Sequence, residues 1–178
     1  MHFARFLTIK GAYDQLYTSM LARGKLPLKD TGVGYWSMAV ADDIYTLFQR
    51  IKLQDSKNFI DIGSGDGKVV MIASLFTKAS GIEIDSELHE KALKVRDKLG
   101  LKAKLVKGDY HDLDLSKYDV IFYHPDHANH KLELKLMDEL KGKLILYGPD
   151  NHPTSFQREM SFIANSTPVS IFVPRRFE

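Results

Sequence analysis

A group of glycines and acids between residues 61 and 67 has the composition of a ligand-binding loop. The segment follows a short apolar run and reads DIGSGDG. Glycine lets the backbone adopt positive φ angles and come close to a ligand. Three alternating glycines flanked by two carboxylates exceed what a tight turn between a strand and a helix requires. We therefore expect this loop to bind a ligand.

The spacing of the glycines argues against a pyrophosphate ligand. The dinucleotide fingerprint needs glycines at the first, third and sixth positions of the loop, and Lys68 occupies the sixth. The Gly-Lys-Ser/Thr ending of a Walker loop is absent. The carboxylates of Asp61 and Asp66 would repel a pyrophosphate, whereas they suit a ligand that carries an ammonium or sulfonium charge.

A further acid, Glu83, ends the next apolar run, about 20 residues beyond the first glycine. At the carboxyl end of a parallel strand, its carboxylate can accept hydrogen bonds from both hydroxyls of a ribose. A ribose joined to a positively charged amino-acid tail is S-adenosylmethionine. These residue types and their spacing therefore predict S-adenosylmethionine as the cofactor.

Three segments resemble, in order and spacing, the first three motifs of the seven-stranded S-adenosylmethionine-dependent methyltransferases: FIDIGSGDGKVV, GIEID and VKGDYHDLD. The resemblance covers roughly residues 38–175 and is closest to the small archaeal protein-lysine methyltransferases related to the disruptor-of-telomeric-silencing enzymes. It implies an α/β fold with a Rossmann-like seven-stranded methyltransferase sheet, mostly parallel with an antiparallel C-terminal hairpin.

The resemblance also implies which residues hold the cofactor. Asp61 and Gly63 would meet the methionine amino group, and Glu83 would bind the ribose hydroxyls. Ile84 would pack on the adenine, and Asp109 would accept a hydrogen bond from its amino group. The full set expected to bind the cofactor is Asp61, Gly63, Ser64, Gly65, Gly67, Glu83, Ile84, Asp109 and Tyr110.

The segment that begins at His124 occupies the place of the fourth motif, which governs the methyl acceptor. Methyltransferases acting on base or glutamine amines carry two prolines and an aromatic residue there, and this segment keeps one proline and lacks the aromatic. A base is needed when the nucleophile arrives protonated, and we expect His124 to serve as that base or to orient the acceptor. Tyr123 and Asp126 are the other catalytic candidates, and the Tyr35-Trp36 pair could cover the cofactor or receive a lysine chain.

A metal site is an alternative role for the same region. Three histidines stand at three-residue spacing, namely His124, His127 and His130. Catechol-type O-methyltransferases hold a divalent cation between an acid at this strand end and a later Asp-Asn pair, and Asp150-Asn151 follows the next apolar run. Because a histidine replaces that first acid, we expect no metal, but a solvated loop in which Asn129 caps the following helix.

The elements that must position these residues are alternating apolar runs and amphipathic helices. Such alternation predicts a parallel sheet with right-handed crossovers. Ser86 is expected to cap one helix. The expected strands are 58–63, 79–85, 103–109, 119–125 and 143–149, followed by a hairpin of 159–164 and 169–174. The expected helices are 12–23, 38–52, a stretch from the glycine loop to about 76, 86–100 and 130–142, with a loop over 24–34.

Composition excludes several classes of protein. The 178 residues include no cysteine, which rules out disulfides and thiolate metal sites. A net charge of +2 does not indicate a nucleic-acid partner. The sequence lacks the apolar run of ~18 residues that a membrane helix needs, and its N-terminus does not resemble a secretion signal, so we expect a cytoplasmic protein.

The charge is uneven, because residues 1–29 hold five basic residues against one acid. We therefore expect residues 1–37 to form a helical arm or lid that recognises the substrate, and residues 38–178 to form the S-adenosylmethionine-binding methyltransferase domain. Deletion of the basic segment should then spare cofactor affinity.

We expect an enzyme that moves a methyl group from S-adenosylmethionine to a nucleophile on a protein or a small molecule, with a protein lysine as one candidate. One alternative is a metal-assisted O-methyltransferase of small molecules. Another is a cofactor-binding module without catalysis on the same fold. A nucleotide-binding oxidoreductase is a third, and Lys68 together with the loop acids counts against it.

Overall fold

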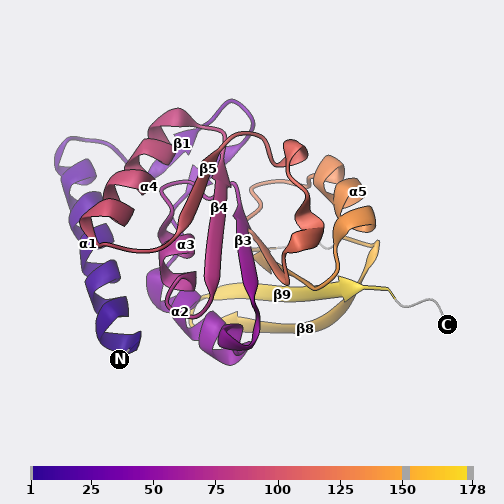
Figure 1. The fold of residues 1–178 in the computed structure, drawn as a ribbon. Helices are drawn as coiled ribbons and strands as arrows, with labels where there is room; N and C mark the ends of the chain where they lie inside the picture. Colours follow the sequence, from indigo (N-terminus) through magenta and orange to yellow (C-terminus); the bar gives the residue numbers. More distant parts are fainter. Residues whose placement is uncertain (1, 150–152, 176–178) are drawn as a thin grey trace.

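A seven-stranded sheet forms the centre of the computed structural model, which describes residues 2–149 and 153–175 (Figure 1). The strands lie in the order β5-β4-β3-β6-β7-β9-β8. The first five of that order are parallel to one another, and β9 and β8 close the sheet as an antiparallel hairpin. The fold class expected from the sequence is therefore confirmed. The strands are β3 (Asn58–Ile62), β4 (Lys78–Glu83), β5 (Lys104–Lys107), β6 (Val120–Tyr123), β7 (Lys143–Tyr147), β8 (Phe156–Ala164) and β9 (Thr167–Pro174).

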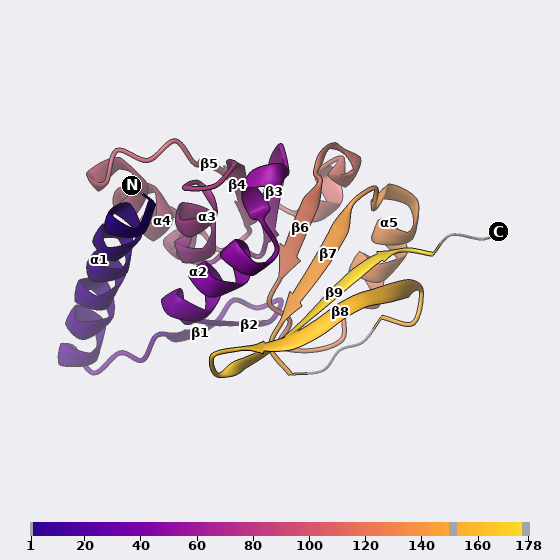
Figure 2. The ribbon, with the colours of Figure 1, turned by 90° about the horizontal axis from the view of Figure 1, so that it is seen from below.

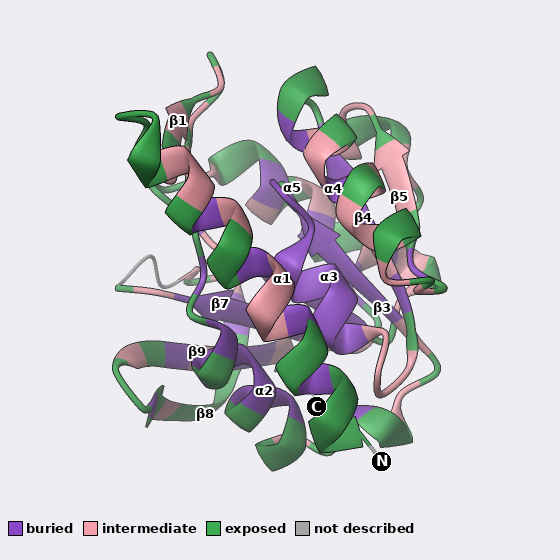
Figure 3. Ribbon diagram, turned by 90° about the vertical axis from the view of Figure 1, so that its left-hand side faces the viewer, coloured by how far each residue is buried: buried purple, intermediate pink, exposed green. Residues whose placement is uncertain are grey.

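Helices cover both faces of this sheet (Figure 2). They are α1 (His2–Ala22), α2 (Ala41–Arg50), α3 (Lys68–Ala73), α4 (Ser86–Lys98) and α5 (His130–Glu139), with 3₁₀ turns at Leu53–Asp55, Tyr110–Asp112 and Leu115–Lys117. Every residue of α3 is buried, because this helix lies between the sheet and α1 and α2 (Figure 3). The helix that follows the glycine loop is therefore held on all sides.

Side chains alternate between the two faces along each strand, and this alternation divides the core in two. Phe59 and Phe122 belong to the cluster beneath α1, α2 and α3. Ile60 and Ile121 point the other way and pack with the apolar face of α5. The central parallel strands are thus packed on both faces, as parallel sheets require. The carboxyl ends of the strands thus remain as the place for a site.

The N-terminal helix is longer than the predicted segment 12–23, since it begins at His2. Its buried stripe consists of Phe6, Ile9, Tyr13 and Tyr17, at the spacing of a helix that packs on one side. These residues belong to the same core cluster as α2 and α3. Arg5 and Lys10, the two Lys/Arg residues within α1, lie outside this buried stripe, on a helix that is itself part of the core.

The loop predicted over 24–34 was wrong in part, because one short strand lies within it and pairs with a second that follows directly. β1 (Leu28–Asp30) pairs antiparallel with β2 (Tyr35–Ser37) in a separate two-stranded sheet. Between them, Gly32 has a φ of 82° and its N–H donates to the Asp30 carboxylate. The glycines that suggested a loop make the turn of a hairpin instead.

The structure tests two predicted helix caps, Ser86 and Asn129. Asp85, not Ser86, caps α4, because the Asp85 carboxylate accepts from the N–H of Leu88 at 2.9 Å. Asn129 caps α5 as expected, with its side-chain oxygen 3.0 Å from the nitrogen of Leu132. In the described part of the chain, no helix combines the length and apolar character needed to cross a membrane.

Candidate active site

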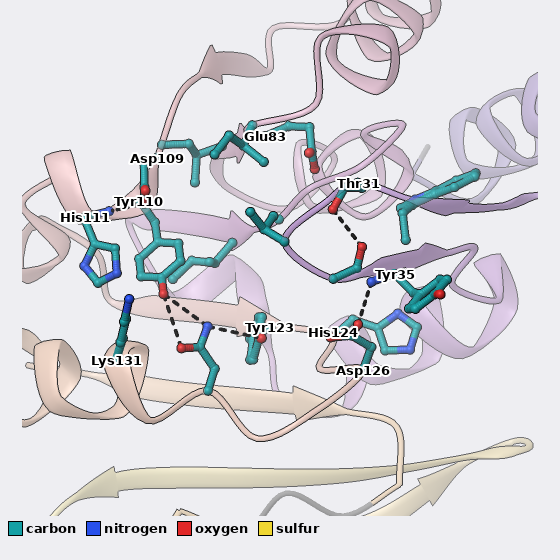
Figure 4. A pocket seen from close by; sticks show the side chains of 18 of the residues that line it. Thr31, Tyr35, Glu83, Asp109, Tyr110, His111, Tyr123, His124, Asp126 and Lys131 are labelled. Carbon is teal, nitrogen blue, oxygen red and sulfur yellow. Dashed lines mark hydrogen bonds between the residues drawn. The ribbon is translucent and has the colours of Figure 1, made fainter.

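A cavity of about 440 Å³ opens at the carboxyl ends of the central parallel strands (Figure 4). This volume is in the range of small-molecule and cofactor sites. The predicted site residues that line it are Gly63, Glu83, Ile84, Asp109, Tyr110, Tyr123, His124 and Asp126. The structure therefore brings together most of the residues predicted for the cofactor and all of those predicted for catalysis.

The three glycines of the loop all have positive φ angles, of 68° at Gly63, 55° at Gly65 and 82° at Gly67. The backbone thus requires glycine there. Gly65 has a second reason to lack a side chain, because a Cβ atom would lie 2.1 Å from the indole nitrogen of Trp36. Trp36 therefore covers the loop at this position.

Four of the predicted cofactor residues, Asp61, Ser64, Gly65 and Gly67, do not line the cavity. The Ser64 hydroxyl lies 2.7 Å from where a Cβ on Gly81 would stand, so this side chain packs against β4. A Cβ on Gly67 would meet Ala92 of α4 at 2.8 Å. Packing therefore explains why Gly67 and Gly81 lack a side chain. The contact of Asp61, Ser64, Gly65 and Gly67 with a cofactor stays a prediction.

The carboxylate of Asp61 has the surroundings that a bound cation would complete. The residue is 3% exposed, and burial together with the charges of Glu83 and Asp66 raises its pKa well above the usual value. Among the described residues, no hydrogen-bond donor reaches this carboxylate. An ammonium group beside it would supply the missing charge, which fits the amino-acid tail of S-adenosylmethionine.

Asp66 does not face the ligand, contrary to the reading of the loop as two acids around a cation. Its carboxylate is buried and accepts a hydrogen bond from the hydroxyl of Tyr17 at 2.6 Å. Its other oxygen accepts from the N–H of Lys68 at 3.3 Å. The fold therefore turns Asp66 toward α1, and the contact of Asp61 with a ligand stays a prediction.

Glu83 is held between the glycine loop and its own strand end. Its two carboxylate oxygens accept from the N–H of Gly65 at 2.7 Å and from the N–H of Asp85 at 2.8 Å. Burial raises its pKa, and these backbone hydrogen bonds oppose the rise. The carboxylate is thus oriented before any ligand arrives, with lone pairs left for further donors.

Asp109, which follows β5, both caps a 3₁₀ turn and lines the cavity. Its carboxylate accepts from the N–H of His111 at 2.9 Å. Beside it, the Tyr110 hydroxyl is 3.1 Å from the Asn129 amide nitrogen (Figure 4). Ile84 is 42% exposed at the cavity, so an apolar surface is available beside these polar groups.

The part of the cavity predicted to receive the methyl acceptor begins where β6 ends. The His124 ring packs edge-on against Tyr147, with their centroids 5.0 Å apart, and burial lowers its pKa despite the nearby charge of Asp126. Burial raises the pKa of Tyr123, whose hydroxyl lies at the limit of hydrogen bonding, 3.5 Å from the Asn129 amide.

The β1–β2 hairpin closes over this half of the cavity. Asp126 accepts from the N–H of Tyr35 at 2.5 Å and contacts His127 at 2.7 Å (Figure 4). Lys29, on β1, pairs with Asp85 and Glu87 at 2.8 Å. Sequence reasoning missed the roles of Thr31, Val33 and Gly34, which also line the cavity. Its one signal was the Tyr35-Trp36 pair.

A metal ion has no ready site among the described residues, where no group of three or more His, Cys, Asp or Glu side chains could hold one. His127 pairs with Asp126, and His130 lies 3.9 Å from Glu133. The Asp150-Asn151 pair and His152 lie outside the described residues.

Comparisons with known proteins place this geometry in a family. Residues 38–132, more than half of the chain, match the model of the family described as histone methylation protein DOT1. Comparison with curated protein sequences finds no significant match.

Solved methyltransferases share the fold. An RNA methyltransferase from Salinibacter ruber, solved with S-adenosyl-L-homocysteine, is 20% identical with a TM-score of 0.67, over 80% of this chain and 97% of the other. A TehB-like SAM-dependent methyltransferase from Corynebacterium glutamicum is 15% identical, with a TM-score of 0.58 over 93% and 97%. The magnesium protoporphyrin IX methyltransferase from Synechocystis is 14% identical, with a TM-score of 0.62 over 75% and 77%.

The similarity to these structures shows the fold, and the family match adds the chemistry associated with it. The chain belongs to the histone methylation protein DOT1 family and is an S-adenosylmethionine-dependent methyltransferase.

Proposed function

We propose that this chain transfers the methyl group of S-adenosylmethionine to the side-chain nitrogen of a protein lysine. The observation that carries the proposal is one continuous cavity with two chemically different halves. One half presents acids and an apolar surface suited to the cofactor. The other presents aromatic rings, a carboxylate and a histidine with a lowered pKa, suited to an amine.

In the cofactor half, Asp61 would meet the amino group and Glu83 the ribose hydroxyls. Ile84 and Asp109 would receive the adenine. When bound, S-adenosylmethionine supplies an activated methyl group on a positively charged sulfur. The fixed carboxylate of Glu83 supports this placement, because both of its oxygens are already oriented by backbone N–H groups.

In the acceptor half, a lysine has to lose a proton before it can act as a nucleophile. His124 supports that step, since its lowered pKa keeps the imidazole neutral and able to take up a proton at neutral pH. Asp126 would attract the incoming ammonium, and the rings of Tyr35 and Tyr123 would contact the lysine stem. Alignment of the nitrogen with the methyl carbon supplies much of the acceleration.

We expected residues 1–37 to form a lid on a methyltransferase domain of residues 38–178, and the proposal now assigns the lid to a shorter segment. The hairpin of residues 28–37 serves as the lid, because it supplies Tyr35 and Trp36 to the cavity. The helix before it packs into the core and is not a free arm.

A labelling experiment tests the proposal. The protein is incubated with methyl-labelled S-adenosylmethionine and, in parallel, a lysine-rich basic protein, RNA and small catechols, each with and without a chelator. We expect label on the protein, recovered as methyl-lysine after hydrolysis, whether or not chelator is present.

The other outcomes identify the alternatives. Label only on a small molecule, lost on adding chelator, supports a metal-assisted O-methyltransferase. Label only on RNA overturns the choice of protein as acceptor. Binding of S-adenosylhomocysteine with no label on any acceptor supports a non-catalytic module. The control acceptor is the same basic protein with its lysines acetylated, which should take up no label.

A further inference from the structure

A buried polar cluster lies behind the glycine loop, on the side away from the cavity. Two tyrosines of α1 reach it: the Tyr17 hydroxyl donates to the Asp66 carboxylate at 2.6 Å, and the Tyr13 hydroxyl donates to the Asp66 carbonyl at 2.8 Å. Tyr13 is 1% exposed and Asp66 3%. Residues about 50 positions apart in the chain are thus joined at the loop that faces the cofactor site.

Lys68 completes the cluster. Its ammonium donates to the carbonyl of Ala39 and lies over the ring of Tyr17, 4.4 Å from the centroid. Burial lowers the pKa of Lys68, and the charge of Asp66 opposes this shift. The opposite charges of Lys68 and Asp66 make the burial of both tolerable, provided that each keeps its hydrogen bonds.

We propose that Tyr13 and Tyr17 are positioning residues for the cofactor-binding loop. They hold Asp66, and through it the backbone from Gly63 to Gly67, in the conformation that places the N–H of Gly65 on the carboxylate of Glu83. α1 lies outside residues 38–132, which match the family model, so an element beyond the matched segment supports the cofactor-binding loop from behind. The inference rests on the proposed cofactor role of Glu83.

The physical reason is the flexibility of the loop itself. Three glycines in seven residues lose a large amount of conformational entropy when they adopt one conformation. Glu83 holds the loop from the cavity side, and the tyrosines hold it from behind. Hydrogen bonds to a buried carboxylate are stronger than those between neutral groups. A loop held from one side only would occupy the binding conformation for part of the time, and the apparent Kd would equal the intrinsic Kd divided by that fraction.

This inference reverses one expectation from the sequence. Removal of the basic N-terminal segment was expected to spare cofactor affinity. The contacts of Tyr13 and Tyr17 with Asp66 predict that cofactor affinity falls when those contacts are lost.

The test removes one hydroxyl at a time and keeps each ring in place. Tyr17→Phe and Tyr13→Phe are compared with wild type for S-adenosylhomocysteine binding by calorimetry, for kcat and KM in the labelling assay, and for melting temperature. We expect Tyr17→Phe to weaken binding about tenfold, with a raised KM for S-adenosylmethionine and an unchanged kcat. Tyr13→Phe should act in the same direction with a smaller effect, because its acceptor is an uncharged carbonyl.

A matched control comes from a second buried carboxylate away from the cavity. The Thr167 hydroxyl donates to Asp43 at 2.6 Å, the same distance as from Tyr17 to Asp66. Thr167→Val should lower the melting temperature and leave cofactor affinity unchanged. If Tyr17→Phe also lowers stability but binds within about twofold of wild type, the tyrosines are merely structural and the inference is overturned.

Two further measurements separate a failure of this inference from a failure of the proposed function. Hydrogen exchange of the amides of residues 63–67 should accelerate in Tyr13→Phe and not in Thr167→Val, which serves if Tyr17→Phe fails to fold. Absence of S-adenosylhomocysteine binding in the wild type would refute the proposed function itself. Normal wild-type binding that neither tyrosine variant changes would refute only the inference about α1.

Discussion

The two halves of the cavity are built in different ways. In the cofactor half, the carboxylate of Glu83 is held by N–H groups at the ends of neighbouring strands, and it is 4% exposed. In the acceptor half, Asp126 is exposed and its partner Tyr35 lies 91 positions away, on a hairpin outside the main sheet. The cofactor half is thus rigid and formed by the strand ends. The acceptor half is completed by a separate segment, which suits it to acceptor selection.

Replacement of His124 should give the largest effect, and that effect should be confined to the acceptor half. We expect His124→Gln to lower kcat by about a hundredfold or more, because general base or orienting groups contribute that much. Its affinity for S-adenosylhomocysteine should stay as in wild type. His89→Gln, on α4 and away from the cavity, is the matched control. Equal loss of cofactor binding in His124→Gln would show that the two halves are not separable.

The same histidine predicts a pH dependence of stability. Burial lowers the pKa of His124 in the folded protein below its usual value of 6.5. Between 6.5 and the lowered value, the unfolded chain takes up the proton and the folded chain does not, so the free energy of unfolding falls as pH falls through that window. Denaturant unfolding across this range measures the free energy of unfolding of wild type and His124→Gln. The two should differ in how steeply this free energy changes with pH inside the window, and above the window that difference in slope should vanish.

Removal of the acid at the end of β4 should damage the cofactor half. Glu83→Ala leaves the N–H groups of Gly65 and Asp85 without their acceptor as well as removing the expected ribose contact. We expect S-adenosylhomocysteine to bind about a hundredfold more weakly. The comparison is calorimetry of Glu159→Ala, because Glu159 lies on the edge strand β8 and pairs with Lys143. A Glu83→Ala protein that binds normally would remove this acid from the site.

A smaller loss of cofactor affinity should follow from adding a methyl group at Gly65, where Trp36 of the lid contacts the glycine loop. Gly65→Ala brings a Cβ to within 2.1 Å of Trp36 at a φ of 55°, so both the loop and the hairpin must shift. We expect cofactor affinity to fall about tenfold. Trp36 is the one tryptophan in the sequence, so its fluorescence reports directly on the hairpin.

The control for that change is Gly11→Ala, within α1, where a Cβ meets nothing within 4 Å. It should raise stability by about 0.5–1 kcal/mol, as expected for alanine in place of glycine in a helix. Unchanged fluorescence in Gly65→Ala would mean that Trp36 does not rest on the loop in solution.

The smallest effect should come from the ion pairs that fasten the lid. Lys29 bridges Asp85 and Glu87, and it helps to lower the pKa of Glu87 to about 2. Because these groups are partly exposed, we expect Lys29→Ala to change kcat/KM for the acceptor by at most about threefold, less so at high salt. Lys143→Ala removes a similar pair far from the lid and should change nothing.

Local patterns were enough to predict most of the sheet and the cofactor motifs. Strand positions followed from short apolar runs, and the positive φ angles of the loop followed from its glycines. The hairpin at residues 28–37 was missed because each of its strands has only three residues, too few to show an alternating pattern. The start of α1 was missed because its buried stripe is interrupted by polar residues and Gly11.

The sequence by itself predicted the class of chemistry, because the residue types and spacing of DIGSGDG and Glu83 are those expected of an S-adenosylmethionine site. Tertiary structure alone decided which partners the two acids of DIGSGDG have. Asp61 and Asp66 look alike in the sequence, but packing of Tyr17 against the loop turns Asp66 toward α1, while no side chain in the described part of the chain donates to Asp61. The reason is that a buried carboxylate must find its partners wherever the fold brings donors to it, and no pattern within the loop specifies where those donors lie.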